Sequence, residues 1–149
     1  MTEHSVRRIL VPVDFSSTSG DALRFAYSLA SALGASIDVL HVMDPSDTLL
    51  DRAADRPSGG DPAVARGLLR DFVAAVASGS VPMTERIEHG EAHDRIVSLA
   101  RDEGFDLIVM GTLGRTGRPL ALVGSVAESV VRTSTRPVLT VRKDPDANP

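Results

Sequence analysis

The sequence contains no cysteine and no tryptophan among its 149 residues. Without cysteine there is no disulfide framework, no thiolate nucleophile and no sulfur-ligated zinc site. This composition is compatible with a reducing compartment, and the cytoplasm is the simplest expectation. Aromatic residues make up only 3% of the chain, so aliphatic side chains must fill most of its core.

Long apolar runs and a strong charge of one sign are also missing. The first apolar run stops at Asp14, and no run approaches the roughly 18 residues that a membrane-spanning helix needs. The formal net charge is only −4, with acidic and basic residues interspersed, which creates no field that would favour a nucleic-acid backbone. We therefore expect no membrane partner and no nucleic-acid partner.

The chain does contain apolar runs that alternate with helical patterns. Residues 8–13, RILVPV, are nearly all apolar, which is typical of a parallel strand buried on both faces. The following segment ends at Gly34 and predicts a helix whose buried face is formed by Ala22, Leu23, Ala26, Leu29, Ala30 and Leu33. Further strands are expected at 36–42, 84–89, 106–110 and 137–141, and further helices at 63–77, 92–103 and 125–132. The strand at 84–89 is the more polar one and is expected near a sheet edge.

This alternation predicts a single α/β domain over residues 1–149, with a parallel sheet covered by helices on both faces. The doubly wound solution gives five strands in the order 3-2-1-4-5. Residues 43–62 have no sustained period and are expected to form a long mobile loop, while 1–5 and 143–149 are expected to be flexible tails.

In such a sheet, ligands bind where the winding reverses, outside the carboxyl ends of the first and fourth strands. Asp14 and Gly111 follow those two ends, so we expect them to face the same site. An alternative role for Asp14 is to cap the helix that follows it.

Four of the twelve glycines lie in the fourteen residues 111–124, which follow the fourth strand: Gly111, Gly114, Gly117 and Gly124. Gly111 can release the strand into a turn, and Gly114 allows main-chain N–H groups to approach an anion closely. Gly124 and Ser125 begin a helix whose unpaired N–H groups and positive dipole end favour phosphate. The pattern is neither a Walker loop nor a Rossmann fingerprint, because the sequence contains no G-x-x-x-x-G-K-[ST] and no G-x-G-x-x-G after a strand.

Several polar residues near this region have ordinary alternative roles. Arg115 and Arg118 can add positive charge, although most surface arginines are only solvated. His41 lies within a strand and is expected to be a packed or hydrogen-bonded core histidine. His89 and His93 are four residues apart, but Gly90 and a strand end separate them, so a metal site there is disfavoured.

Three segments together resemble a known family. The chain closely resembles the ATP-binding subgroup of the universal stress protein family in these segments: RILVPVDFS, VLHV, and DLIVMGTLGRTG followed by LVGSVAESVV and RPVLTVR. The resemblance implies an adenine nucleotide alpha hydrolase-like fold. It implies that Pro12, Val13 and Asp14 line the adenosine part of the pocket, with Asp14 near the ribose hydroxyls, and that Val42 meets adenine through its backbone. The remaining nucleotide-binding positions implied by the resemblance are Met110, Gly111, Gly114, Arg115, Gly124, Ser125 and Val126.

The resemblance also implies the ligand and the assembly. The ligand would be ATP or another adenine nucleotide, with Mg²⁺ or Mn²⁺ shared among its phosphate oxygens and Ser125 as the one protein group near the ion. A homodimer would form through the last strand, Val138–Val141. The chain departs from the family at Leu113, where histidine is common, and at residues 133–136, where an apolar segment is common.

The resemblance favours a nucleotide-dependent regulatory switch in the stress response, acting on an unidentified protein partner. We expect at most slow ATP hydrolysis, because phosphoryl transfer needs a group that orients the nucleophile and no residue is compelling for that role. The alternative is a nucleotide-independent dimeric interaction module. An adenylating enzyme is disfavoured, because such enzymes carry an S-G-G-x-D-S type loop after the first strand and this chain has DFSSTSGD there. A phosphoacceptor receiver domain is disfavoured, because Phe15 follows Asp14 and His89-Gly90 ends the third strand.

Overall fold

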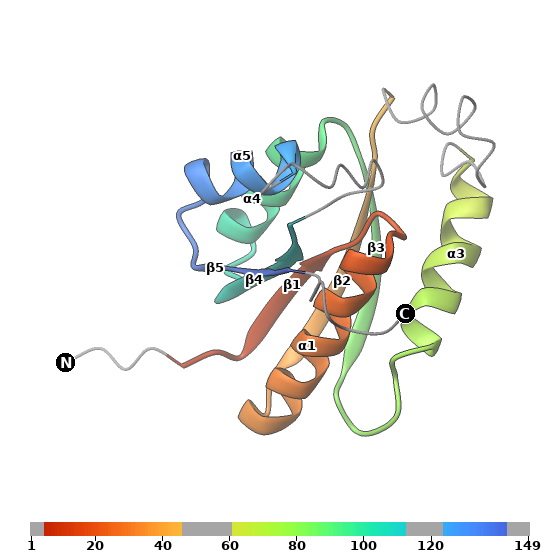
Figure 1. Cartoon of the computed structure of the whole chain (residues 1–149), viewed down its shortest axis with the longest axis vertical. Coiled ribbons are helices and arrows are strands. Elements are labelled where there is room, and N and C mark those ends of the chain that lie inside the picture. Colours follow the sequence, from red (N-terminus) through yellow and green to blue (C-terminus); the bar gives the residue numbers. More distant parts are fainter. Residues whose placement is uncertain (1–4, 46–60, 113–123, 143–149) are drawn as a thin grey trace.

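The computed structural model describes residues 5–45, 61–112 and 124–142 (Figure 1). Its strands are β1 (Arg8–Pro12), β2 (Ser36–Met43), β3 (Met83–His89), β4 (Leu107–Gly111) and β5 (Val138–Val141). Its helices are α1 (Ser17–Leu33), α3 (Pro62–Ala74), α4 (Ala92–Asp102) and α5 (Ser125–Thr133). Every strand and helix predicted from the sequence is present, with ends that differ by three residues at most.

The five strands form one all-parallel sheet in the order β3-β2-β1-β4-β5, as predicted. The polar strand β3 lies at one edge and β5 at the other. The winding therefore reverses between β1 and β4, which are neighbours with Ile9 opposite Leu107 and Leu10 opposite Ile108.

Two apolar cores lie on opposite faces of the sheet. Figure 1 shows α1 and α3 on one side of the strands and α4 with α5 on the other. Alternate strand residues serve the two cores, because successive side chains of a strand point to opposite faces. The first core contains Ile9, Val11, Ala22, Leu23, Ala26, Val39, Leu69 and Val109, and the second contains Leu10, Leu40, Ile96, Leu99, Phe105, Ile108 and Val130.

Local sequence determines where the helices begin and end. Ser16 caps α1, since its side-chain oxygen accepts from the Ser19 N–H, and Gly34 ends the helix in the left-handed conformation at φ 69°. Asp14 is therefore not the helix cap. On the predicted buried face of α1, Leu29 is only partly buried and Leu33 is 51% exposed, because Leu33 lies in the last turn of the helix. The other predicted residues of this face are buried.

A charged cluster completes the face of the sheet beneath α4. Asp38 lies within 3.3 Å of Arg86 and 3.9 Å of Arg8, and Arg86 also forms a two-pronged ion pair with Glu103 at 2.6–2.7 Å. The Arg8 guanidinium lies 4.2 Å from the centre of the Phe105 ring. These contacts allow a mostly buried carboxylate to occupy the interior of β2.

Across the three described ranges, no helix combines the length and apolar character needed to cross a membrane.

Candidate functional site

The candidate site lies at the carboxyl ends of β1, β2 and β4. Val13, Val42 and Met110 lie at these ends, and the three residues are 5%, 7% and 5% exposed. Val13 packs into the core beneath α1, whereas Val42 and Met110 pack into the opposite core. Because these side chains are occupied by packing, the main chain is what these positions offer to a ligand.

A tight turn follows β1. Asp14 is partly buried, and its Oδ1 accepts a hydrogen bond from the Ser16 N–H at 3.0 Å. Phe15, between them, has φ 66°, a left-handed conformation that is uncommon for a bulky residue. Such backbone strain is often found at functional sites, where the surrounding structure maintains it. The turn places the Asp14 carboxylate at the carboxyl end of β1, where the sequence predicted it.

Aromatic contacts support this turn. The Phe15 ring centre lies 4.5 Å from that of His41 and 5.7 Å from that of Phe72. His41 is only 2% exposed, and its Nδ1 lies 2.9 Å from the Val13 carbonyl oxygen. The expectation of a packed, hydrogen-bonded core histidine is confirmed.

Gly111 is part of β4, and its lack of a side chain has a packing reason. A Cβ on Gly111 would lie 2.7 Å from Thr18 Cγ2 and 3.0 Å from the Thr18 backbone carbonyl. The first turn of α1 therefore rests directly on the end of β4. This contact brings the β1–α1 connection and the end of β4 together, as expected for the point where the winding reverses.

The amino end of α5 has no side-chain cap. Gly124 is the N-cap residue, and its N–H donates to the Thr112 carbonyl. Ser125 and Val126 follow in the first turn, and both are exposed. The first N–H groups of a helix have no partner within the helix and carry a partial positive charge. This end of α5 is therefore suited to an anion.

Part of the predicted site lies outside the described residues. Gly114 and Arg115 fall within 113–123, as do Leu113, Gly117 and Arg118. The structure brings together the other predicted positions through three neighbouring strands and the two helices that start beside them: Pro12, Val13, Asp14, Val42, Met110, Gly111, Gly124, Ser125 and Val126.

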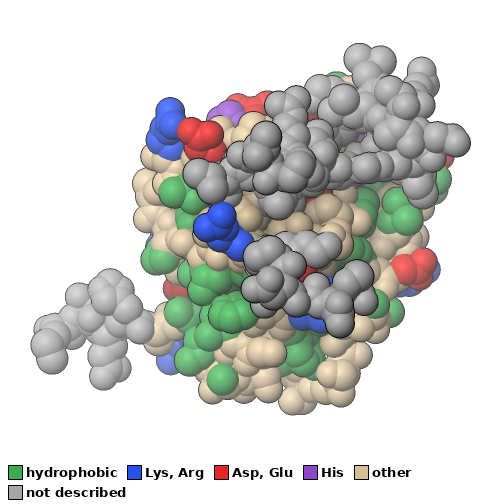
Figure 2. All heavy atoms as spheres, viewed as in Figure 1, with side chains coloured by type: hydrophobic (Ala, Val, Ile, Leu, Met, Phe, Trp, Pro, Cys, Tyr) green, Lys and Arg blue, Asp and Glu red, His purple; other side chains and the backbone are tan. Residues whose placement is uncertain are grey.

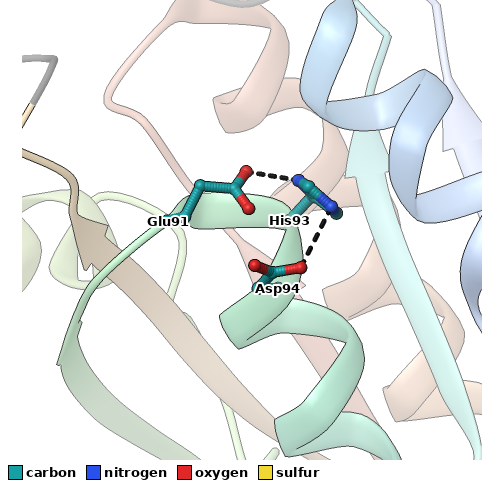
Figure 3. Close-up of side chains that lie close together, drawn as sticks. All are labelled: Glu91, His93 and Asp94. Carbon is teal, nitrogen blue, oxygen red and sulfur yellow. Dashed lines mark hydrogen bonds and ion pairs between the residues drawn. The ribbon is translucent and has the colours of Figure 1, made fainter.

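A second polar cluster lies at the start of α4 (Figure 3). His93 Nδ1 contacts Glu91 Oε1, and His93 Nε2 lies 3.1 Å from Asp94 Oδ1. Each imidazole nitrogen is thus directed at a different carboxylate, and the positive end of the helix disfavours a cation. His93 therefore belongs to a local acid–histidine network with Glu91 and Asp94, and the expectation that His89 and His93 form no metal site stays a prediction.

Acidic and basic side chains of the described residues are mixed on the face that Figure 2 shows. On the face seen in Figure 2, the described arginine and acidic side chains are scattered among hydrophobic ones. An ion pair away from the candidate site shifts the pKa of both partners: the hydrogen bond from Arg86 lowers the pKa of the Glu103 carboxyl, and the same contact raises the pKa of Arg86.

Two contributors to the site were not predicted from the sequence. Phe15 was considered only as a residue that excludes a receiver domain, yet its backbone forms the turn after β1. Asp44 follows β2, and its Oδ2 accepts from the Ala92 N–H of α4 at 3.3 Å. The sequence around Asp44 contains no local signal for this contact, because its partner Ala92 is 48 positions away.

Comparison with known families gives a match over nearly the whole chain. The model of the universal stress protein family matches residues 5–142. Universal stress protein MJ0531 of Methanocaldococcus jannaschii is 33% identical over 150 aligned residues, which cover 95% of this chain and 85% of that protein. Universal stress protein MJ0577 of the same organism is 29% identical over 154 aligned residues, covering 92% of this chain and 95% of that protein.

Solved structures show the same architecture. The structure of MJ0577 superposes with a TM-score of 0.79 at 28% identity, covering 94% of this chain and 98% of that one. The crystal structure of a universal stress protein in complex with cAMP superposes with a TM-score of 0.67 at 28% identity, covering 94% and 99% of the two chains.

Proposed function

Because the chain belongs to the universal stress protein family, we propose that it binds an adenine nucleotide, with ATP as the main ligand, at the carboxyl ends of β1, β2 and β4. The observation that carries this proposal is the uncapped amino end of α5 beside the point where the sheet's winding reverses. A related protein of the same architecture binds cAMP, which also contains adenosine and phosphate.

The proposed orientation follows from the charge at each end of the site. The phosphates lie against Gly124, Ser125 and Val126, where the helix presents N–H groups and positive potential. The adenosine lies toward Pro12, Val13 and Val42, and the Asp14 carboxylate accepts from the ribose hydroxyls. Gly114 and Arg115 complete the phosphate side, and Met110 and Gly111 form its floor.

A divalent cation, Mg²⁺ or Mn²⁺, accompanies the phosphates in this proposal. Ser125 is exposed in the first turn of α5, so its hydroxyl can reach a cation shared with phosphate oxygens. Hard cations of this kind are usually bound by few protein groups together with substrate phosphates. This donor set fits a nucleotide-borne ion.

The proposed role is a nucleotide-dependent regulatory switch in the stress response, acting in the cytoplasm on a protein partner and hydrolysing ATP slowly at most. The protein acts as a homodimer joined through β5, whose outer edge lacks a strand partner among the described residues. The second candidate function is a nucleotide-independent dimeric module, which the same edge strand favours. This second function predicts that no ligand binds where the winding reverses between β1 and β4.

Mass spectrometry of nucleotide released from the purified protein tests the two candidates. ATP, ADP, AMP or cAMP is the expected release product. In addition, Gly124→Val is expected to abolish ATP binding while the far-ultraviolet circular dichroism stays native, because the side chain would cover the open helix end. Gly114→Val is the corresponding variant on the other side of the phosphates. Retained ATP affinity in both variants would place the phosphates elsewhere.

A further inference from the structure

The pairing of β1 with β2 stops before β2 ends. The last rung joins Pro12 to Leu40, and the Val13 N–H donates to the Leu40 carbonyl at 2.8 Å. On its other side β2 remains paired with β3 as far as Met43. Backbone groups of alternate residues point to the same side of a strand. The N–H and C=O of Val42 therefore point toward β1, beyond the place where β1 has turned away.

The Val13 carbonyl is the acceptor that a further rung would offer to the Val42 N–H. It instead accepts from His41, whose Nδ1 lies 2.9 Å away; a carbonyl only accepts, so Nδ1 carries the proton. Among the hydrogen bonds of the described ranges, none joins the backbones of Val13 and Val42. His41 is 2% exposed, so water does not compete for this contact.

The same imidazole also supports the turn that carries the chain away from β2. Phe15 adopts φ 66°, which is unfavourable for a bulky side chain. Its ring lies against those of His41 and Phe72, with centres 4.5 Å and 5.7 Å away. Packing of this kind can maintain a strained backbone conformation.

We infer that His41 is a positioning residue for the base of the bound nucleotide. By engaging the Val13 carbonyl and the Phe15 ring, His41 ends the β1–β2 ladder and leaves the Val42 N–H and C=O directed at the ligand. One donor beside one acceptor matches adenine, whose N6 amino group donates next to an accepting ring nitrogen. Hypoxanthine presents an accepting oxygen at the same position and is disfavoured. This inference rests on the proposed function.

Two substitutions separate the roles of the imidazole. His41→Phe keeps an aromatic ring against Phe15 and removes the donor. His41→Asn keeps an N–H at the position of Nδ1, since both nitrogens are bonded to Cγ, and removes the ring. His89→Phe, at an exposed histidine that ends β3, serves as the control.

Calorimetric titrations with ATP and ITP provide the first measurement. The unmodified protein is expected to prefer ATP. In His41→Phe, ATP affinity should fall by about threefold to tenfold, the usual effect of one lost hydrogen bond, and the ATP/ITP ratio should approach one. His41→Asn should retain the ratio, and His89→Phe should match the unmodified protein. An unchanged ratio in His41→Phe overturns the inference.

The second measurement is amide hydrogen exchange of the ligand-free protein by NMR. Val42 should exchange much faster than Leu40 in the unmodified protein, and it should become protected in His41→Phe because the Val13 carbonyl is released to it. If Val42 exchanges as slowly as Leu40 in the unmodified protein, the inference is overturned even if His41→Phe does not fold. If neither ATP nor ITP binds the unmodified protein, both the proposed function and the base-positioning role of His41 are wrong. The exchange rate of the Val42 amide still decides whether His41 ends the β1–β2 pairing.

Discussion

Gly111 lies so close to Thr18 that a Cβ at position 111 would be 2.7 Å from Thr18 Cγ2 and 3.0 Å from the Thr18 carbonyl carbon and oxygen. The backbone part of this contact cannot be relieved by a side-chain rotation. Gly111→Ala is therefore expected to displace the first turn of α1 and lower the free energy of unfolding by about 1–3 kcal/mol. Urea denaturation measures this change.

Gly67→Ala provides the matched control for that prediction. Gly67 lies within α3, and a Cβ there would have no neighbour within 4 Å. Alanine in a helix interior is expected to raise the free energy of unfolding by about 0.5–1 kcal/mol. The packing explanation for Gly111 would be wrong if both alanine substitutions stabilised the protein.

Asp14 is expected to contribute to nucleoside binding as well as to nucleotide binding. Asp14→Asn keeps Oδ1 as the acceptor for the Ser16 N–H and removes the negative charge that strengthens hydrogen bonds to ribose. Affinity for adenosine and for ATP should fall by similar factors, about tenfold or more, in calorimetric titrations. Asp14→Ala also removes the contact with the Ser16 N–H, so this variant should bind both ligands more weakly than Asp14→Asn. A loss confined to ATP would contradict the ribose assignment.

The pair of Arg86 and Glu103 is expected to make stability depend on pH. The hydrogen bond from Arg86 lowers the pKa of Glu103 in the folded state. Its stabilising contribution is therefore present above the unfolded-state pKa of about 4.3 and is lost as the pH falls through the lower folded-state value. The stability difference between the unmodified protein and Glu103→Gln should be present at pH 7 and should shrink in acid.

Urea denaturation over a range of pH measures that difference. Glu85→Gln, at an exposed carboxylate of β3, is the control and should change stability little at any pH. A difference between the unmodified protein and Glu103→Gln that stayed constant down to pH 3 would show that the ion pair does not produce the effect.

The outer edge of β5 is expected to form the dimer contact. The Pro137 carbonyl accepts from the Ile108 N–H of β4, and the Val141 carbonyl accepts from the Thr112 N–H just after β4. The backbone groups of Val138 and Thr140 therefore point outward. Thr140 is exposed, and Thr140→Lys would place like charges at a two-fold contact, as natural edge strands do to prevent pairing. Sedimentation equilibrium should show a dimer for the unmodified protein and a monomer for Thr140→Lys, with unfolding nearly unchanged. A monomeric unmodified protein would contradict the dimer proposal.

The fold could be predicted because its signals are local. Apolar runs such as residues 8–13 identify buried strands, Gly34 ends a helix, and the handedness of parallel crossovers then leaves few strand orders. The position of Asp14 and Gly111 at the switch point followed from that order. Leu33 was misplaced because helical periodicity does not reveal how far the sheet beneath α1 extends.

The finer features of the site depend on contacts between distant residues. Glycine at 111 was predicted to allow a turn, whereas the structure also requires it for the approach of Thr18, 93 positions earlier in the chain. The left-handed conformation of Phe15 has no sequence signal, since glycine or asparagine is usual there. The contact of His41 with Val13 depends on the register of β1 and β2, which only the assembled sheet determines.

The central claim is that the phosphates lie at the amino end of α5 while the adenosine lies at the ends of β1 and β2. Gly124→Asp tests it, because an aspartate N-cap accepts from the N–H groups of α5 and places a negative charge where the phosphates are proposed. This change should leave the helix as stable as before or slightly more stable.

Calorimetric titration of ATP and adenosine into the unmodified protein and Gly124→Asp is the most direct measurement. ATP is expected to bind the unmodified protein and to lose affinity by about tenfold or more in the variant, from charge repulsion and lost hydrogen bonds, while adenosine binds both equally. Equal ATP affinity in the two proteins, or no binding of ATP to the unmodified protein at millimolar concentration, would contradict the account.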